Sequence, residues 1–297
     1  MARRHAVALE TVSVIVPPDA MEAYEGALRS ACGTVGFFLD EDAGVWRVEG
    51  VKDQGADEDA LAGALALAAL VTGFQATLLR EATPSDGWLA RTYAGFPEQL
   101  VGKRFALRGT HLSGTATPGR LVLLLDAGIA FGSGEHGSTR GCLRALERVA
   151  YRRPRRILDL GTGSGVLAMA AAKLLHRRVT ATDIDPWSVR VARDNAALNG
   201  LRNRLRCLRA DGWSAPAVRQ PGPYDLIFAN ILARPLCQMA RQMALNLAPG
   251  GTLILAGLLR TQVNWVLAAY RRQGLRLEVT LAEGAWAALV LRKSNAA

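Results

Sequence analysis

Three alternating glycines and two aspartates carry the clearest chemical signal in the sequence. Gly161, Gly163 and Gly165 follow Asp159 in a D-x-G-x-G-x-G pattern, and Asp183 lies 22 residues beyond Gly161. Glycine lets a backbone turn sharply and approach a ligand where a Cβ would collide. An acid at the end of the following strand is placed to accept hydrogen bonds from ribose hydroxyls. These residues therefore predict a site for a nucleotide-like ligand.

A strand, a helix and a second strand are expected to position these five residues. Residues 157–160 are apolar except for one acid, which is typical of a parallel strand covered on both faces. Residues 166–175 form an apolar run of helical length, and residues 178–183 are expected to form the next strand. The pattern indicates a βαβ unit with its glycine turn between the first strand and the helix.

The glycine spacing distinguishes between classes of nucleotide ligand. Dinucleotide enzymes need G-x-G-x-x-G, but Val166 occupies the position of the last glycine. The observed spacing is the form seen in S-adenosylmethionine methyltransferases of the Rossmann-like class, whose ligand has no pyrophosphate to bind at a helix N-terminus. The alternative is an ordinary strand-to-helix turn, which the accompanying Asp159 and Asp183 disfavour.

A glycine-rich loop at 126–139 precedes this unit and could fold over a bound ligand. We expect Phe131 to pack against the cofactor or to shape the substrate entrance. Thr139 lies at a predicted helix start, where it could cap the helix or face the ligand. His136 could be a hydrogen-bonding residue of the loop or a catalytic group.

Two further polar residues follow predicted strands of the same sheet. Asp211 follows the strand at 205–208, where an acid can meet an adenine amino group, and turn chemistry is the alternative. Asn230 follows the strand at 226–229, at the carboxyl end where open α/β sheets bind ligands. The alternative for Asn230 is a turn residue, and its position favours function.

The coarse element order predicts two domains. Residues 1–83 have the order βαββαβ, with the last strand at 74–79, and are predicted to be a small α+β ferredoxin-like domain that recognises the substrate. Residues 84–102 are predicted to be a linker with a short helix at 88–93. Residues 103–297 are predicted to form an α/β domain with a seven-stranded sheet. Strands at 104–109 and 121–125 would flank it, with a hairpin as one possible pairing.

Charge is distributed unevenly along the 297 residues. Residues 1–100 contain 7 Lys+Arg and 15 Asp+Glu, a balance of −8, whereas residues 101–297 contain 29 and 11, a balance of +18. This asymmetry either reflects genome composition and solvated faces, or indicates an acidic module for a basic protein and a cationic body near RNA.

Cysteine usage and hydropathy indicate the compartment. The four cysteines include no C-x-x-C pair, which argues against a metal site and fits a reducing cytosol. The most apolar stretch, 60–74, is too short for a bilayer span. We therefore expect a cytoplasmic protein with no membrane partner.

Four segments together resemble one known family, the ribosomal protein L-eleven methyltransferases, or PrmA. They are the loop at 126–139, the turn at 158–165, the Asp-Ile-Asp-Pro of 183–186, and the Asn-Ile-Leu-Ala-Arg-Pro-Leu of 230–236. The resemblance covers nearly the whole chain and implies a class I methyltransferase domain. It differs at 137 and 138, where Gly-Ser replaces the usual Pro-Thr of the family.

The resemblance implies S-adenosylmethionine as the cofactor. Thr139, Gly161, Asp183 and Asn230 occupy the motif positions at which the family would contact this cofactor. The residue patterns add three further candidates for cofactor contacts, Gly163, Asp211 and Phe131. It also implies methylation of lysine side chains and of the N-terminal amine of a large-subunit ribosomal protein, free or near ribosomal RNA.

Asn230 is the predicted catalytic residue, because its side-chain carbonyl could hold the amine; fixing the cofactor is its other possible role. A nucleic-acid amino-methyltransferase is a second reading, in which an aromatic residue shortly after the asparagine stacks on a flipped base. Ile231, Leu232 and Ala233 follow here instead. A non-catalytic cofactor-binding protein that docks on ribosomes is a third reading. We expect a monomer that does not bind DNA.

Overall fold

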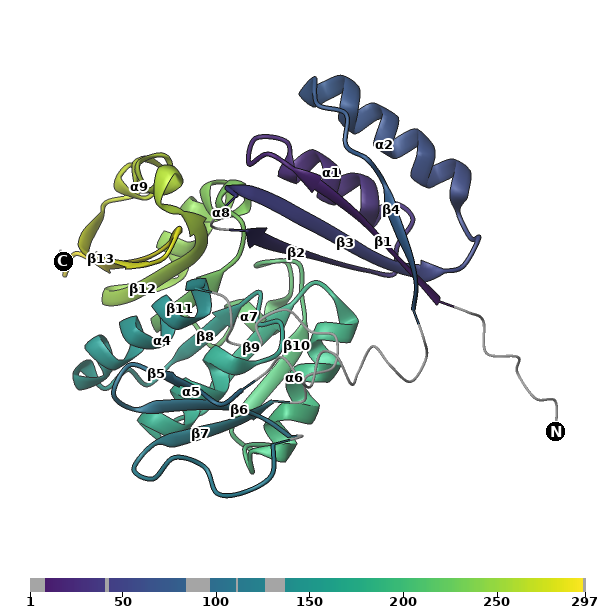
Figure 1. Cartoon of the computed structure of the whole chain (residues 1–297). Coiled ribbons are helices and arrows are strands. Elements are labelled where there is room, and N and C mark those ends of the chain that lie inside the picture. Colours follow the sequence, from purple (N-terminus) through teal and green to yellow (C-terminus); the bar gives the residue numbers. More distant parts are fainter. Residues whose placement is uncertain (1–8, 41–42, 84–96, 111, 126–136, 296–297) are drawn as a thin grey trace. The chain divides into compact units, whose positions relative to one another are not determined.

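The computed structural model describes residues 9–40, 43–83, 97–110, 112–125 and 137–295 (Figure 1). The chain divides into two units, Met1–Ala94 and Gly95–Ala297. Each unit has its own sheet and its own buried residues, so each is described separately.

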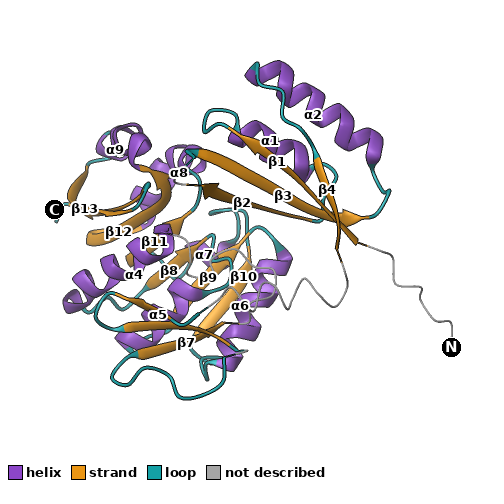
Figure 2. Cartoon of the chain, in the orientation of Figure 1, coloured by secondary structure: helices purple, strands orange, loops and turns teal. Residues whose placement is uncertain are grey.

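Unit 1 has the predicted order βαββαβ. Its elements are β1 (Leu9–Val16), α1 (Met21–Arg29), β2 (Thr34–Asp40), β3 (Val45–Asp53), α2 (Glu58–Thr72) and β4 (Leu79–Thr83). The four strands form an antiparallel sheet in the order β2-β3-β1-β4. Figure 2 shows α1 and α2 beside this sheet. The last strand begins at Leu79, whereas the apolar run had placed it at 74–79.

Alternating side chains make the core of unit 1. Val12, Val14 and Val16 of β1 are fully buried, as expected for every second residue of a half-covered strand. They share the core with Tyr24 and Leu28 of α1. Burial of these apolar side chains is the main force that holds α1 on the sheet.

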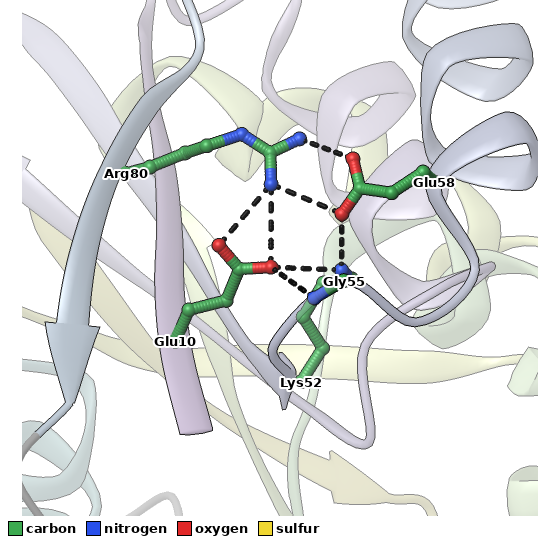
Figure 3. Close-up of polar contacts among 5 residues, drawn as sticks. All are labelled: Glu10, Lys52, Gly55, Glu58 and Arg80. Atoms are coloured by element: carbon green, nitrogen blue, oxygen red, sulfur yellow. Dashed lines mark hydrogen bonds and ion pairs between the residues drawn. The ribbon is translucent and has the colours of Figure 1, made fainter. Parts of the chain in front are cut away.

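A cluster of four charged side chains joins three strands and α2 in unit 1 (Figure 3). Lys52 Nζ lies 2.9 Å from Glu10 Oε1 and 2.6 Å from Glu58 Oε1. Arg80 contacts the same two carboxylates at 3.1 and 2.5 Å. The hydrogen bond from Arg80, with that from Lys52, lowers the pKa of Glu58 to about 2. The Lys52 side chain is 1% exposed, so its charge depends on these partners.

Unit 2 contains the predicted seven-stranded sheet. Its elements are β5 (Gln99–Val101), β6 (Phe105–Gly109), β7 (Leu121–Leu125), α4 (Gly137–Val149), η1 (Ala150–Arg152), β8 (Ile157–Leu160), α5 (Val166–Leu175), β9 (Val179–Asp183), α6 (Pro186–Leu198), β10 (Leu205–Arg209), α7 (Pro216–Arg219), β11 (Tyr224–Asn230), α8 (Ala233–Asn246), β12 (Leu247–Leu259), η2 (Arg260–Gln262), α9 (Val263–Arg271), β13 (Leu275–Glu283) and β14 (Trp286–Lys293). The strand order is β10-β9-β8-β11-β12-β14-β13. The first five strands are parallel, and β14 runs antiparallel to both of its neighbours.

Both faces of this sheet are covered, which explains why its strands are apolar throughout. Leu226 and Phe228 of β11 pack with residues of α4, α5 and α6 on one face. Ile227 and Ala229 pack with residues of α8 and α9 on the other face. Because successive side chains of a strand point to opposite faces of the sheet, one apolar run contributes to both hydrophobic cores.

The segment before the large sheet differs from the prediction in two respects. β6 and β7 pair in parallel, so the possible hairpin between them is wrong. The residues between these strands are numerous enough for the chain to cross back to the start of β6 before it enters β7. Gln99–Val101, placed in the predicted linker, form β5 and pair with β6. The helix predicted at 88–93 lies outside the described residues.

Candidate functional site

Adjacent strands of the large sheet bring the predicted site residues to one edge. Leu160 of β8 pairs with Ala229 of β11 on one side and with Thr182 of β9 on the other. Asp183, Gly161 and Asn230 directly follow these three paired residues. They therefore lie next to one another in that order along the carboxyl edge of the sheet. Neighbouring strands lie about 4.8 Å apart, so one small molecule can reach all three.

The glycine turn has the backbone conformation that its composition predicts. Gly161, Gly163 and Gly165 have φ values of +71°, +52° and +83°. Backbone N–H groups of Gly161 and Thr162 donate to the Thr182 carbonyl oxygen at 2.8 and 2.9 Å, which holds the turn against the end of β9. A Cβ on Gly161 would lie 2.4 Å from Ile231 Cγ2. The Ile231 side chain therefore packs directly against the backbone of Gly161, which only a residue without a side chain allows.

Asp183 lies beside this turn with both carboxylate oxygens partly used. Oδ2 accepts the backbone N–H of Gly163 at 2.9 Å, and Oδ1 accepts that of Asp185 at 3.0 Å. Each oxygen retains a lone pair for a ligand hydroxyl. Burial raises the pKa of Asp183, and these backbone hydrogen bonds oppose that rise. The carboxylate is thus oriented by the turn and still able to accept hydrogen bonds from a ribose.

Asp159 has a different role from Asp183, because it lies under the turn and is fully buried. Its Oδ2 accepts the Thr162 hydroxyl at 2.6 Å and the Ala168 N–H at 3.1 Å. The other oxygen has no hydrogen-bond partner within the described ranges. Burial raises the pKa of Asp159 to about 6. The acid of the glycine pattern therefore ties the turn to the first turn of α5.

Asn230 ends β11 and contacts Thr139, which lies in the first turn of α4. Its Nδ2 donates to Thr139 Oγ1 at 3.4 Å, and its buried Oδ1 has no hydrogen-bond partner among the residues that the structure describes. A buried acceptor without a donor is unfavourable by roughly 1–3 kcal/mol. An N–H group of a ligand would remove that cost. The sequence placed Thr139 at the helix boundary, but α4 already begins at Gly137.

The structure also shows why glycine fits at position 137, where the chain departs from the family loop. A Cβ at Gly137 would lie 2.7 Å from the Glu283 carbonyl oxygen and 2.9 Å from Trp286 Cδ1. The turn between β13 and β14 thus occupies the space that a larger residue would need at the start of α4.

The remaining predicted residues are less well defined. Asp211 is exposed and lies two residues beyond β10, on the same edge of the sheet. Phe131 and His136 lie outside the described residues. Sequence reasoning missed Thr162 and Ile231. Thr162 was a candidate in retrospect because a hydroxyl three residues after a buried acid can satisfy it.

Two features of the described parts of the chain bear on other functions. None of the helices there is both long enough and apolar enough to span a bilayer. Nor do three or more His, Cys, Asp or Glu side chains in those parts converge as metal ligands would.

Comparison with known proteins shows which family has a sequence similar to that of this chain. A sequence model of the family described as ribosomal protein L11 methyltransferase (PrmA) matches residues 12–294. A protein of Rhizobium meliloti (strain 1021) with that name is 45% identical over 256 residues, which cover 86% of this chain and 87% of the relative. A protein of the same name from Bradyrhizobium diazoefficiens is 50% identical over 191 residues, 64% of this chain and 65% of the relative.

A solved structure is similar in three dimensions. The crystal structure of a ribosomal protein L11 methylase from Lactobacillus delbrueckii subsp. bulgaricus aligns with a TM-score of 0.59 at 30% sequence identity. The alignment covers 66% of this chain and 98% of that chain.

Proposed function

Because the chain belongs to the ribosomal protein L11 methyltransferase (PrmA) family, we propose that it methylates lysine side chains and the N-terminal amine of a large-subunit ribosomal protein. Its methyl donor is S-adenosylmethionine. The observation that carries the proposal is the buried Oδ1 of Asn230 beside the glycine turn, which has no hydrogen-bond partner among the described residues. An amine is a hydrogen-bond donor that could satisfy this oxygen.

The residues of the carboxyl edge fit this donor. Asp183 would accept hydrogen bonds from the ribose hydroxyls, and Gly161 and Gly163 leave room for the methionine part. Asp211 would meet the adenine amino group, and Thr139 would contact the donor from α4. Phe131, which lies outside the described residues, stays a proposed donor contact on the sequence pattern alone. When bound, the sulfonium supplies an electrophilic methyl group.

The protein must present the amine neutral and aligned. A lysine has an unperturbed pKa of about 10.4, so its ammonium must lose a proton before the nitrogen can attack. Desolvation at the site favours the neutral form. Asn230 Oδ1 would accept one N–H of the amine and so direct its lone pair, while α4 holds the amide through Thr139. Placement of this kind supplies much of the rate of a displacement, and we assign no general base.

Unit 1 would recognise the protein substrate. Its helix α2 is almost entirely apolar, yet only Leu61 and Ala68 are buried. Leu67, Leu70 and Val71 are 61%, 81% and 73% exposed. Exposed apolar area of this kind marks interaction surfaces, and the negative balance of residues 1–100 suits a basic partner. We infer a cytoplasmic monomer that acts on a ribosomal protein, free or near ribosomal RNA, and not on DNA or membranes.

A methyl-transfer assay with labelled S-adenosylmethionine tests the proposal. The purified chain is incubated with large-subunit ribosomal proteins, with ribosomal RNA, or with buffer, and the labelled protein is mapped by mass spectrometry. We expect label on lysines and on an N-terminal amine. Label in RNA alone would contradict the proposal. Donor binding without transfer to either would support a non-catalytic protein.

A further inference from the structure

Arginines gather where the chain leads into three adjacent parallel strands of unit 2. Residues 152–156 have the sequence Arg-Arg-Pro-Arg-Arg and precede β8, Arg177 and Arg178 precede β9, and Arg202 and Arg204 precede β10. The sheet order β10-β9-β8 makes these segments neighbours. They lie at the amino edge of the sheet, opposite the edge that carries the glycine turn.

Two clefts bring four of these arginines together with two others. One cleft of about 260 Å³ is lined by Arg152, Arg153, Arg155 and Arg292. The other, of about 610 Å³, is lined by Arg104, Arg153 and Arg177. Arg153 lines both clefts, so the two clefts are adjacent. We call these six arginines the basic edge.

The acidic side chains nearest to this surface are largely occupied by backbone groups. Asp225 Oδ2 accepts the backbone N–H groups of Arg155 and Arg156 at 2.9 and 2.8 Å. The Glu147 carboxylate accepts those of Lys103 and Arg104 at 3.1 and 2.7 Å. These carboxylates therefore mainly satisfy main-chain donors, and the ion pair of Asp225 with Arg156 is long, at 3.9 Å.

Most cations of the basic edge form no ion pair with another described residue. Arg152 pairs with Glu278 at 2.7 Å. Arg153, Arg155 and Arg177 are exposed and form no ion pair within the described parts of the chain. Clustered unpaired guanidinium groups create a positive potential that attracts polyanions.

The helix dipole explains only part of this arrangement. The arginine-bearing segments follow η1, α5 and α6, and a cation near a helix C-terminus is favourable by about 0.3–1 kcal/mol. That effect decays within the last turn. Arg155 lies three residues beyond η1, and Arg177 lies two residues beyond α5. A single cation at each helix end would also be sufficient to interact favourably with the helix dipole, so the dipole does not account for several arginines in each segment.

We propose that the basic edge binds the phosphate backbone of single-stranded RNA. Guanidinium groups match phosphate oxygens bidentately. Tyr151 lines the second cleft and is 74% exposed. The Arg152 guanidinium lies 5.4 Å from its ring centroid, so a base could stack on the exposed part of a ring that already carries an arginine. Arginines interleaved with an exposed aromatic ring are typical of surfaces that bind single strands. A flat lipid surface would not need clefts.

The placement at the amino edge has a functional consequence. RNA bound there lies across the sheet from Asn230 and Asp183, so it leaves the carboxyl edge open to donor and substrate. Binding of RNA and transfer of a methyl group to protein can therefore occur on the same molecule at the same time.

The test compares two triple variants of the full chain with equal loss of charge. One is R153Q/R155Q/R177Q, and the control is R190Q/R241Q/R260Q, which removes three exposed arginines outside the basic edge. Binding to a fluorescently labelled single-stranded RNA of about 20 nucleotides is measured by anisotropy over a range of salt concentrations. Each lost contact with a single strand reduces the slope of log K against log salt by about 0.7.

We expect the basic-edge variant to lose at least about tenfold in affinity and about 2 in slope, and the control to stay within about twofold of the wild type. R153K/R155K/R177K retains the charges and should retain the slope. If the glutamine triple does not fold, R177Q alone should lose about 0.7 in slope.

Several results would overturn the proposal. They are equal loss in both triple variants, unchanged RNA binding by the basic-edge variant, and a lowered melting temperature as its sole effect. Binding of the wild type to phosphatidylglycerol vesicles but not to RNA would assign the surface to membranes. None of these measurements uses methyl transfer, so their outcome is independent of the proposed activity.

Discussion

Asn230 Nδ2 donates to Thr139 Oγ1 across 91 residues of sequence, and the other end of the same amide is buried without a partner among the described residues. The two ends of this side chain therefore have different surroundings. α4 holds the nitrogen, and the oxygen is left for a group that none of the described residues supplies. This asymmetry gives the amide a defined direction at the edge of the sheet.

Replacing Asn230 by alanine should lower the rate of methyl transfer and leave donor binding nearly intact. A single positioned hydrogen bond in a desolvated site is worth about 100-fold in rate. Single-turnover transfer and calorimetric donor affinity would be measured together. Thr139→Val removes only the anchor of the amide and should have a smaller effect on the rate. An unchanged rate in Asn230→Ala would remove this residue from the mechanism.

Adding a methyl group at Gly161 should weaken donor binding. Both Gly161 and Gly200 have φ near +70°, but a Cβ on Gly200 meets nothing within 4 Å. Gly200→Ala therefore costs only the backbone strain, about 1–2 kcal/mol of stability. Gly161→Ala adds the collision with Ile231, so either the turn or the Ile231 side chain must shift at the proposed donor site. We expect donor affinity, measured by calorimetry, to fall at least about tenfold in Gly161→Ala alone.

Asp183 and Asp185 allow a second matched pair of substitutions. Asp183→Ala removes the carboxylate placed for the ribose and should weaken donor binding by about 100-fold, as expected for the loss of charged hydrogen bonds. Asp185 caps α6 by accepting the N–H groups of Trp187 and Ser188. Asp185→Ala should cost about 1 kcal/mol of stability and change donor affinity little. Equal donor affinity in wild type and Asp183→Ala would refute the assignment of the cofactor site.

These contrasts also indicate what the sequence could and could not provide. Alternation of strands and helices places the ends of parallel strands on one edge, so the approach of Gly161, Asp183 and Asn230 followed from the pattern. The contact between Asn230 and Thr139 did not, because it depends on how α4 packs on the sheet. The parallel pairing of β6 and β7 was missed for a related reason, since a connecting segment does not reveal its path.

Stability should depend on pH through Asp159. Its pKa is raised from 3.8 to about 6 in the folded state, so the folded protein binds this proton more tightly than the unfolded chain does. Stability from this group is complete below about pH 4 and falls as the pH rises towards 6, by about 3 kcal/mol in total. Asp159→Asn should abolish this component. Urea unfolding of both proteins from pH 4 to 8 would measure the difference.

We expect a specific dependence of the unfolding free energy on pH in these urea experiments. The difference in unfolding free energy between wild type and Asp159→Asn should change between about pH 4 and 6 and then become flat. A difference that does not change with pH would show that the pKa of Asp159 is not raised and that the group is already ionised in the folded protein above about pH 4. The carboxylate would then have a counter-charge near its second oxygen.

Breaking the charged cluster of unit 1 should loosen its sheet locally. Lys52→Met removes one cation from between Glu10 and Glu58 and leaves Arg80 to compensate both, so we expect a loss of about 2 kcal/mol. Arg47→Met is the control on the same strand, because its ion pair with Glu49 is exposed and worth about 0–1 kcal/mol. Hydrogen exchange of β1 and β3 amides in the full chain would report the change.

The directions of the pKa shifts in this cluster determine at which pH the hydrogen-exchange experiment should show a difference. The pKa values of Glu10 and Glu58 are lowered from 4.5, so their contribution is complete above that pH and is lost on acidification. The pKa of Lys52 is raised from 10.5, because its two carboxylates outweigh the effect of burial. At pH 7 all members are charged, and faster exchange should appear in Lys52→Met alone. At about pH 2 the carboxylates take up protons, so the Lys52→Met and Arg47→Met variants should exchange alike. A difference that persists at this pH would mean that Lys52 acts through packing instead of charge.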